Sequence, residues 1–157
     1  VYVNEDFHGV ELAGALKNVM AIAAGIADGL DFGLDARAAL ITRGLAEMSR
    51  LGEALGARAR TYMGLAGMGD LVLTCTGDLS RNRQVGLKIG QGMKLQEILD
   101  EMNMVAEGVK TTEAVCALGR EKGVELPISN QVHEVLFGGK SPEKAVRELM
   151  TRTLKCE

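Results

Sequence analysis

The chain has 157 residues, of which 46% are hydrophobic and 25% are charged, and its formal net charge is −3. That hydrophobic content is enough for one domain with its own core, and the slightly acidic balance argues against a general nucleic-acid binder, which carries a basic face. The three cysteines stand far apart and the two histidines have no partner at ligand spacing, so we expect neither a disulfide scaffold nor a metal site.

The first nine residues are typical of a linker. Val1-Tyr2-Val3 resembles the end of a strand, and polar residues follow it. We therefore expect residues 1–9 to be the end of an interdomain segment. Residues 10–27 are apolar on nearly every side, which predicts a buried central helix. Lys17 interrupts this run, which stays shorter than the roughly 20 apolar residues that span a bilayer, so we expect no membrane span.

The rest of the chain predicts further helices and no sheet. Asp35 is a candidate N-cap for a second helix that ends near Leu55, with Gly56 just past its end. After a glycine-rich stretch, residues 71–74 predict a short buried helix. No alternating strand pattern is longer than a few residues, so the expected fold class is all-α. The remaining predicted helices cover residues 80–89, 95–102, about 111 or 112 to 123, 127–137 and 142–149.

Lys17 is the first candidate for chemistry. It is the only charged residue between Leu12 and Ala27, and its helical neighbours are apolar or small. Because burying an ammonium is costly, a lysine in such surroundings is a candidate general acid or base. The sequence fits equally well a lysine that extends from the rim of the helix into solvent.

Asp70 has the same isolated character, since no other charge lies between Met63 and Thr76. It follows three glycines, where aspartate commonly caps a helix. A capped, semi-buried carboxylate could also orient a lysine or a substrate hydroxyl, and the two interpretations are compatible. The glycines before it do not form a dinucleotide fingerprint, because the spacing and the preceding strand are missing.

The segment Ser80-Arg81-Asn82-Arg83 stands at the start of a predicted helix. Free backbone N–H groups and the positive end of the helix dipole attract phosphate. Arg81 adds a fork of donors suited to phosphate oxygens, and Asn82 adds an amide donor. Taken by itself, the segment is more often a solvated, capped helix start with two surface arginines. Glu107, taken by itself, is a loop carboxylate.

Five segments occur in a recognisable order. They are GVELAGALKN at residues 9–18, TRGLAE at 42–47, GLAGMGDLVLTCT at 64–76, SRNR at 80–83 and VAEGV at 105–109. In this order they resemble the C-terminal helical half of the bacterial NAD(P)-dependent glycerol-3-phosphate dehydrogenases, and the resemblance covers essentially the whole chain. Each segment is weakly specific, whereas the five in order are highly specific.

The resemblance implies a cytoplasmic homodimer that interconverts dihydroxyacetone phosphate and sn-glycerol 3-phosphate with NAD or NADP and feeds glycerophospholipid synthesis. It implies an N-terminal Rossmann domain, absent from this chain, joined to a helical substrate-binding and dimerisation domain at residues 10–157. That helical domain would be like the C-terminal domain of 6-phosphogluconate dehydrogenase. The preference for NAD or NADP would be set by the missing half.

The same resemblance implies roles for individual residues. Lys17 would donate and accept the proton, and Asp70 and Thr74 would support the substrate and the lysine. Ser80, Arg81 and Asn82 would hold the phosphate, and Arg81, Val105 and Glu107 would contact the cofactor. Two alternatives stay open: a related dehydrogenase of the same architecture that acts on another small hydroxy compound, and a non-catalytic helical dimerisation module.

Overall fold

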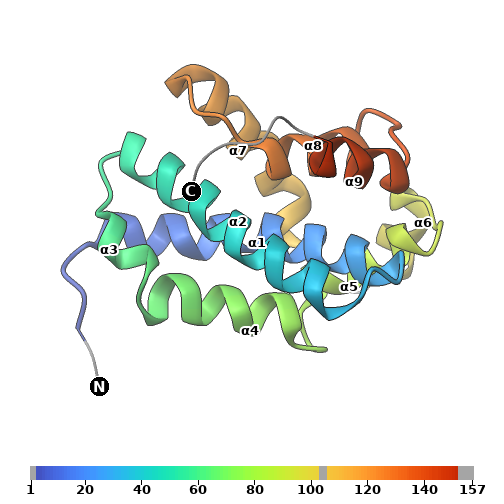
Figure 1. Ribbon diagram of the computed structural model, residues 1–157, viewed down its shortest axis with the longest axis horizontal. Helices are drawn as coiled ribbons and strands as arrows, with labels where there is room; N and C mark the ends of the chain where they lie inside the picture. The colour runs from blue at the N-terminus through green and yellow to red at the C-terminus, as the bar shows by residue number, and fades with distance from the viewer. Residues whose placement is uncertain (1–2, 103–105, 152–157) are drawn as a thin grey trace.

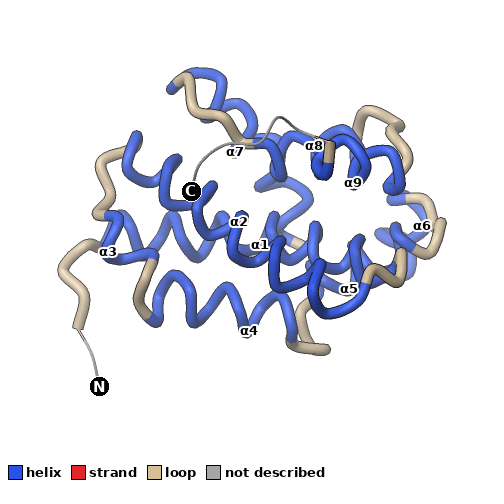
Figure 2. The backbone as a smooth tube through the Cα atoms, viewed as in Figure 1, coloured by secondary structure: helices blue, strands red, loops and turns tan. Residues whose placement is uncertain are grey.

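The computed structural model describes residues 3–102 and 106–151, and in this part it contains nine α-helices, one π-helical turn and no strand (Figures 1 and 2). The all-α prediction is therefore confirmed. The elements are α1 (Phe7–Gly29), α2 (Gly33–Ala54), α3 (Ala59–Tyr62), η1 (Leu65–Gly69), α4 (Asp70–Thr76), α5 (Arg81–Gly90), α6 (Leu95–Glu101), α7 (Glu107–Lys122), α8 (Pro127–Leu136) and α9 (Pro142–Met150).

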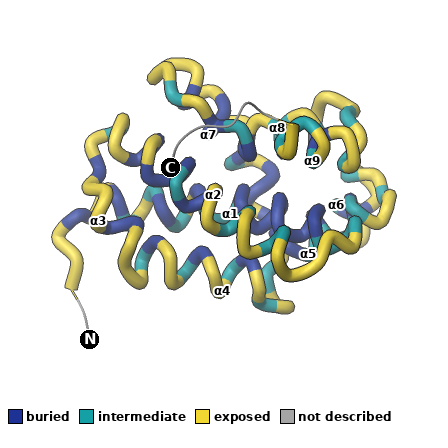
Figure 3. The backbone as a smooth tube through the Cα atoms, viewed as in Figure 1, coloured by how far each residue is buried: buried dark blue, intermediate teal, exposed yellow. Residues whose placement is uncertain are grey.

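Helix α1 is the centre of the molecule. Helices α2, α4, α5, α7 and α8 all contact it, and most of its length is buried (Figure 3). Within residues 3–102 and 106–151 it is the one helix long and apolar enough to cross a membrane. Every residue from Val19 to Ala27 is buried, so a buried position accounts for this composition.

Asp6 makes α1 start at Phe7, three residues earlier than predicted. The Gly9 N–H donates to Asp6 Oδ1 at 3.0 Å, which caps the helix. Asp6 Oδ2 accepts from the Arg58 N–H at 2.9 Å and the Thr61 hydroxyl at 2.6 Å. The Thr61 hydrogen bond is the largest cause that lowers the pKa of Asp6. The cap therefore depends on partners more than fifty residues away.

Two further helix starts differ from the prediction. Helix α2 begins two residues before Asp35, which lies in the first turn, where a carboxylate interacts favourably with the helix dipole. Helix α7 begins at Glu107. The hydroxyls of Thr111 and Thr112 donate to main-chain oxygens four residues back, at 2.9 and 2.7 Å. Such bonds belong to the interior of a helix, so neither threonine is a cap.

Helix α4 is amphipathic, and the prediction that residues 71–74 are buried was wrong for half of them. Leu71 and Cys75 lie on one face and are fully buried, whereas Val72 and Leu73 are 41% and 69% exposed. Residues four apart share a face of a helix, and the residues between them point elsewhere. The outer face of α4 is largely exposed (Figure 3).

Helices α1 and α5 pack backbone against backbone through glycines. A Cβ on Gly25 would overlap the main-chain oxygen of Arg83, and a Cβ on Gly86 would overlap a main-chain oxygen of α1. Gly29 and Gly90 repeat this contact farther along the two helices. The close approach therefore sets the distance of α5 from α1.

Glu47 on α2 caps the first turn of α8, although the two lie far apart in the sequence. Its side chain accepts from the N–H groups of Ile128 and Ser129, both at 2.8 Å, and from the Ser129 hydroxyl at 2.6 Å. The residue is 1% exposed. Burial raises the pKa of Glu47, while the hydrogen bonds from Ser129 and Ile128 act in the opposite direction.

Replacing Glu47 with alanine is expected to lower the free energy of unfolding by about 3 kcal/mol, because buried donors lose their acceptor. Urea unfolding of the purified chain, followed by circular dichroism, measures this loss. The matched control is Glu53→Ala on the same helix, where an exposed carboxylate accepts one bond from Ser49 and the change should stay below about 1 kcal/mol. Equal stabilities for the two variants would contradict the capping role.

Candidate functional site

Lys17 on α1 and Asp70 on α4 form an ion pair. The Lys17 ammonium donates to Asp70 Oδ2, and the two side chains are 21% and 36% exposed. One turn along α4, the Thr74 hydroxyl donates to the main-chain oxygen of Asp70 at 2.6 Å and lies 3.3 Å from Asp70 Oδ1. The structure therefore brings together three of the residues singled out in the sequence.

This pair shows how Asp70 and Lys17 are placed. Asp70 is the first residue of α4, with Gly69 at the cap position, and its carboxylate binds the lysine instead of capping the helix. Lys17 is neither buried without a partner nor extended freely into solvent. An ammonium that a carboxylate holds at a half-exposed position can exchange a proton with a bound ligand.

The start of α5 presents hydrogen-bond donors. Ser80 is its N-cap, and its hydroxyl oxygen accepts from the Arg83 N–H at 3.3 Å. Arg81 is exposed and has no hydrogen-bond or ion-pair partner in the described part of the chain. Asn82 Oδ1 accepts from the Gly108 N–H at 2.9 Å, which leaves the Nδ2 donors of Asn82 for another partner. A guanidinium and an amide at a helix N-terminus suit an anion.

Asn82 also links the start of α7 to the start of α5. A Cβ on Gly108 would lie 2.7 Å from the main-chain oxygen of Asn18 and 2.8 Å from Asn82 Oδ1, and Asn18 directly follows the paired lysine. Glu107 is exposed in the first turn of α7, not in a loop. The predicted contact residue Val105 lies outside the described residues. The middle of α1 and the starts of α5 and α7 therefore meet at one site.

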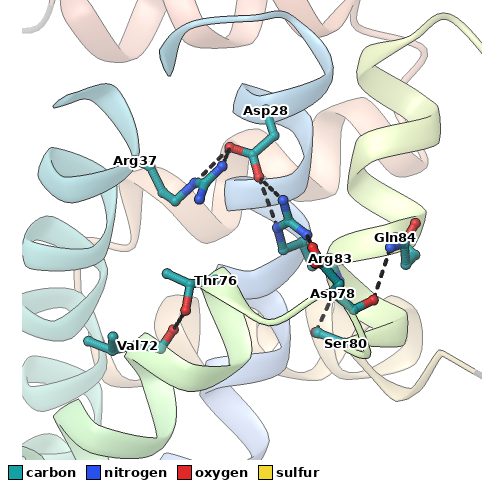
Figure 4. Close-up of polar contacts among 8 residues, drawn as sticks. All are labelled: Asp28, Arg37, Val72, Thr76, Asp78, Ser80, Arg83 and Gln84. Carbon is teal, nitrogen blue, oxygen red and sulfur yellow. Dashed lines mark hydrogen bonds and ion pairs between the residues drawn. The ribbon is translucent and has the colours of Figure 1, made fainter. Parts of the chain in front are cut away.

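An ion-pair network beside α5 was not evident in the sequence (Figure 4). Arg37 donates to Asp28 Oδ1 through Nε at 2.8 Å and Nη2 at 2.6 Å. Arg83 donates to Asp28 Oδ2 through Nε at 2.9 Å and Nη2 at 2.8 Å, and its Nη1 lies 3.0 Å from Asp78 Oδ1. The side chains of Asp28 and Arg83 are 7% and 10% exposed, so Arg83 is not a surface arginine.

One sequence signal could have indicated this network. Asp28 lies in the last turn of α1, where a carboxylate opposes the negative end of the helix dipole. Nearby cations offset this unfavourable interaction. The sequence signal for Asp28 therefore points to arginine partners, although it does not say which arginines they are.

The Lys17 cluster is open to solvent. An open groove lies elsewhere, with Val3, Arg58 and Leu65 among its lining residues, and neither Lys17 nor Asp70 lines it. Within residues 3–102 and 106–151, no three His, Cys, Asp or Glu side chains gather as metal ligands would. The arrangement can bind an anion at the start of α5 and move a proton at Lys17.

Comparison with known proteins places these features in a family. The sequence-family model described as the NAD-dependent glycerol-3-phosphate dehydrogenase C-terminus matches residues 6–147 of this chain. A protein from Maridesulfovibrio salexigens named glycerol-3-phosphate dehydrogenase, NAD(P)+, is 70% identical over 157 residues, which are 100% of this chain and 47% of that protein. A protein of the same name from Geobacter sulfurreducens is 65% identical over 157 residues and is covered to 47%. The chain thus spans about half the length of the curated relatives it matches.

Solved structures agree with this result. The crystal structure of a glycerol-3-phosphate dehydrogenase from Coxiella burnetii matches with a TM-score of 0.94 and 49% identity, over 97% of this chain and 47% of that one. The enzyme structure from Saccharomyces cerevisiae matches with a TM-score of 0.87 and 29% identity, over 97% of this chain and 44% of that one. Both therefore contain the helical arrangement described above.

Proposed function

The chain belongs to the NAD-dependent glycerol-3-phosphate dehydrogenase family, in its C-terminal part, and from this premise we propose that it is the substrate-binding and catalytic half of an enzyme that interconverts dihydroxyacetone phosphate and sn-glycerol 3-phosphate. The Lys17–Asp70 ion pair, beside a helix start with free donors, is the observation that supports this function. We further propose a cytoplasmic homodimer that supplies glycerophospholipid synthesis.

Lys17 would donate the proton in one direction of the reaction and accept it in the other. A nicotinamide cofactor, NAD or NADP, would supply or take up the hydride at C2 of the substrate. When the ketone is reduced, its oxygen needs a proton, and the Lys17 ammonium would donate it; in the other direction the amine would accept it. Asp70 would hold the ammonium in place, and the Thr74 hydroxyl would support the Asp70 carboxylate.

The start of α5 would hold the phosphate. Arg81 and the Nδ2 group of Asn82 would donate to its oxygens, together with the backbone N–H groups that the helix start presents. The hydroxyl oxygen of Ser80 accepts from the Arg83 N–H, which fixes this turn, and its O–H would donate to the phosphate. The position of these donors favours a phosphate over a carboxylate substrate, which would need a differently placed anion site.

Two residues at the edge of the site suit a dinucleotide. Arg81 and Glu107 are both exposed, and Asn82 links the helices that carry them. A guanidinium at this edge could contact a cofactor phosphate as well as the substrate. The remainder of the cofactor would lie against the half of the relatives that these 157 residues do not cover. Val105, outside the described residues, stays a predicted cofactor contact.

The whole enzyme tests this function. Full-length protein should oxidise NADH or NADPH only when dihydroxyacetone phosphate is present, which absorbance at 340 nm would report as about one cofactor consumed per substrate. Full-length protein without such turnover would overturn the proposal and would favour a dehydrogenase for another hydroxy compound.

The 157 residues by themselves are expected to show no turnover, even at high concentrations of cofactor and dihydroxyacetone phosphate, because they match only the C-terminal half of the relatives and would not include a nucleotide-binding half. The same assay applied to the purified 157-residue chain checks this, with the full-length enzyme as positive control. Substrate-dependent cofactor oxidation by the isolated chain would contradict the proposal that the other half of the enzyme is needed to bind the cofactor.

A further inference from the structure

The two arginines at the start of α5 have different surroundings. Arg81 is exposed without a partner in the described part of the chain, whereas Arg83 is held by two carboxylates. We propose that Arg83 and Asp28 are positioning residues that hold the phosphate-binding turn of α5 in place. This inference rests on the function proposed above, and it assigns to the pair no contact with substrate.

Arg83 connects three parts of the chain (Figure 4). Its Nε and Nη2 bind Asp28 at the end of α1, and its Nη1 binds Asp78 in the loop before α5. Gln84 Nε2 donates to the main-chain oxygen of Asp78 at 3.0 Å, and the Arg83 N–H donates to Ser80. The loop and the first turn of α5 are therefore fastened to one another and to α1.

The glycine contact between α1 and α5 does not provide this constraint. It sets how closely the two helix axes approach, and the buried side chains of Val85 and Ile89 hold the middle and the end of α5 in the core. Arg81 and Asn82 lie in the first turn of α5, directly before Arg83. The ion pairs of Arg83 with Asp28 and Asp78 fasten this turn to α1 and to the preceding loop, so their loss should displace the donors of Arg81 and Asn82.

Arg83 is poorly suited to bind phosphate itself. Its Nε, Nη1 and Nη2 all lie on carboxylate oxygens, and the side chain is 10% exposed. Turning it toward a ligand would leave Arg37 as the cation that compensates the buried Asp28, and an imperfectly compensated buried carboxylate is costly. The geometry therefore separates an anion-binding arginine, Arg81, from a positioning arginine, Arg83.

Arg37 provides a matched control. It binds the other oxygen of the same carboxylate through the same two kinds of nitrogen, but it comes from α2 and, in the described part of the chain, has no hydrogen bond or ion pair to α5. Arg83→Met and Arg37→Met each remove one cation from Asp28, so both should lower the melting temperature. Only Arg83→Met should disturb the phosphate-binding turn.

The experiment uses the full-length enzyme and two substrates, dihydroxyacetone phosphate and dihydroxyacetone, which lacks the phosphate. Arg83→Met should raise KM for the phosphorylated substrate at least about tenfold, because small misplacements of binding groups are expensive. It should leave kcat/KM for dihydroxyacetone within about twofold of wild type, since that substrate makes no use of the anion site. Arg37→Met should leave both within about twofold.

Equal effects of Arg83→Met and Arg37→Met, or equal losses with both substrates, would overturn the positioning role. If Arg83→Met does not fold, Arg83→Lys gives the same test, because an ammonium cannot span Asp28 and Asp78 as the fork does. Asp28→Asn should also raise KM; an unchanged or lower KM would mean that Arg83 binds the phosphate directly. A wild-type enzyme without preference for the phosphorylated substrate would instead overturn the proposed function.

Discussion

Replacing Lys17 with alanine in the full-length enzyme is expected to lower kcat for dihydroxyacetone phosphate by about 10²–10⁴-fold, with a much smaller change in KM. A general acid acts on the transition state, so its loss appears in the chemical step. Steady-state kinetics at saturating cofactor measure both constants. Lys144→Ala is the control, because it removes an exposed cation from α9 and should leave both constants unchanged.

Arg81→Ala should give the opposite pattern. The bonds from Arg81 to phosphate would exist in the ground state as well as in the transition state, and each charge-assisted bond contributes roughly 1.5–3 kcal/mol. KM should therefore rise by about ten- to a hundredfold. Near-normal kcat for Lys17→Ala with a change in KM only would make Lys17 a binding residue, and Asp70 or an ordered water would then be the next candidate for the proton donor.

The second large effect concerns stability. Gly25→Ala is expected to lower the free energy of unfolding by about 3 kcal/mol, because overpacking forces backbones apart. The new methyl would overlap the main-chain oxygen of Arg83 on α5, and backbone cannot move aside as the end of a flexible side chain can. Urea unfolding of the chain, followed by circular dichroism, measures the loss.

Gly14→Ala on the same helix is the matched control. Nothing lies within 4 Å of a Cβ added at Gly14, so alanine there should stabilise α1 by about 0.5–1 kcal/mol through its higher helix propensity. The two substitutions are chemically identical, and they should change the free energy of unfolding in opposite directions. Similar free energies of unfolding for both variants would contradict the close contact between α1 and α5.

The sequence predicted the ends of those helices that are capped or terminated by residues next to them in the chain. Gly123 ends α7 in a left-handed conformation with φ of 64°, Pro127 starts α8, and the Ser141 hydroxyl oxygen caps α9. The start of α1 was missed because the carboxylate that caps it, at Asp6, is itself fixed by Thr61 across the fold. The capping of α8 by Glu47 was missed for the same reason, since the two lie 81 residues apart.

The candidate site followed the same division. Lys17 and Asp70 were found because each is an isolated charge in an apolar or glycine-rich segment, and such isolation can be read along the chain. Their pairing across 53 residues could not be read in this way. The sequence of the α5 start predicts a surface position for Arg83, because its two carboxylate partners come from the end of α1 and from a loop.

The position of Lys17 has a consequence for motion during turnover. The lysine lies in the middle of α1, and Leu16 and Val19 beside it are buried in the core. The face of α1 that carries Leu16 and Val19 can move only when the surrounding core is disrupted, so we expect the backbone that carries Lys17 to stay in place on the timescale of catalysis. We therefore expect any rearrangement that admits substrate or excludes water to occur in the parts of the protein that cover the site, while Lys17 and its partner carboxylate keep their positions.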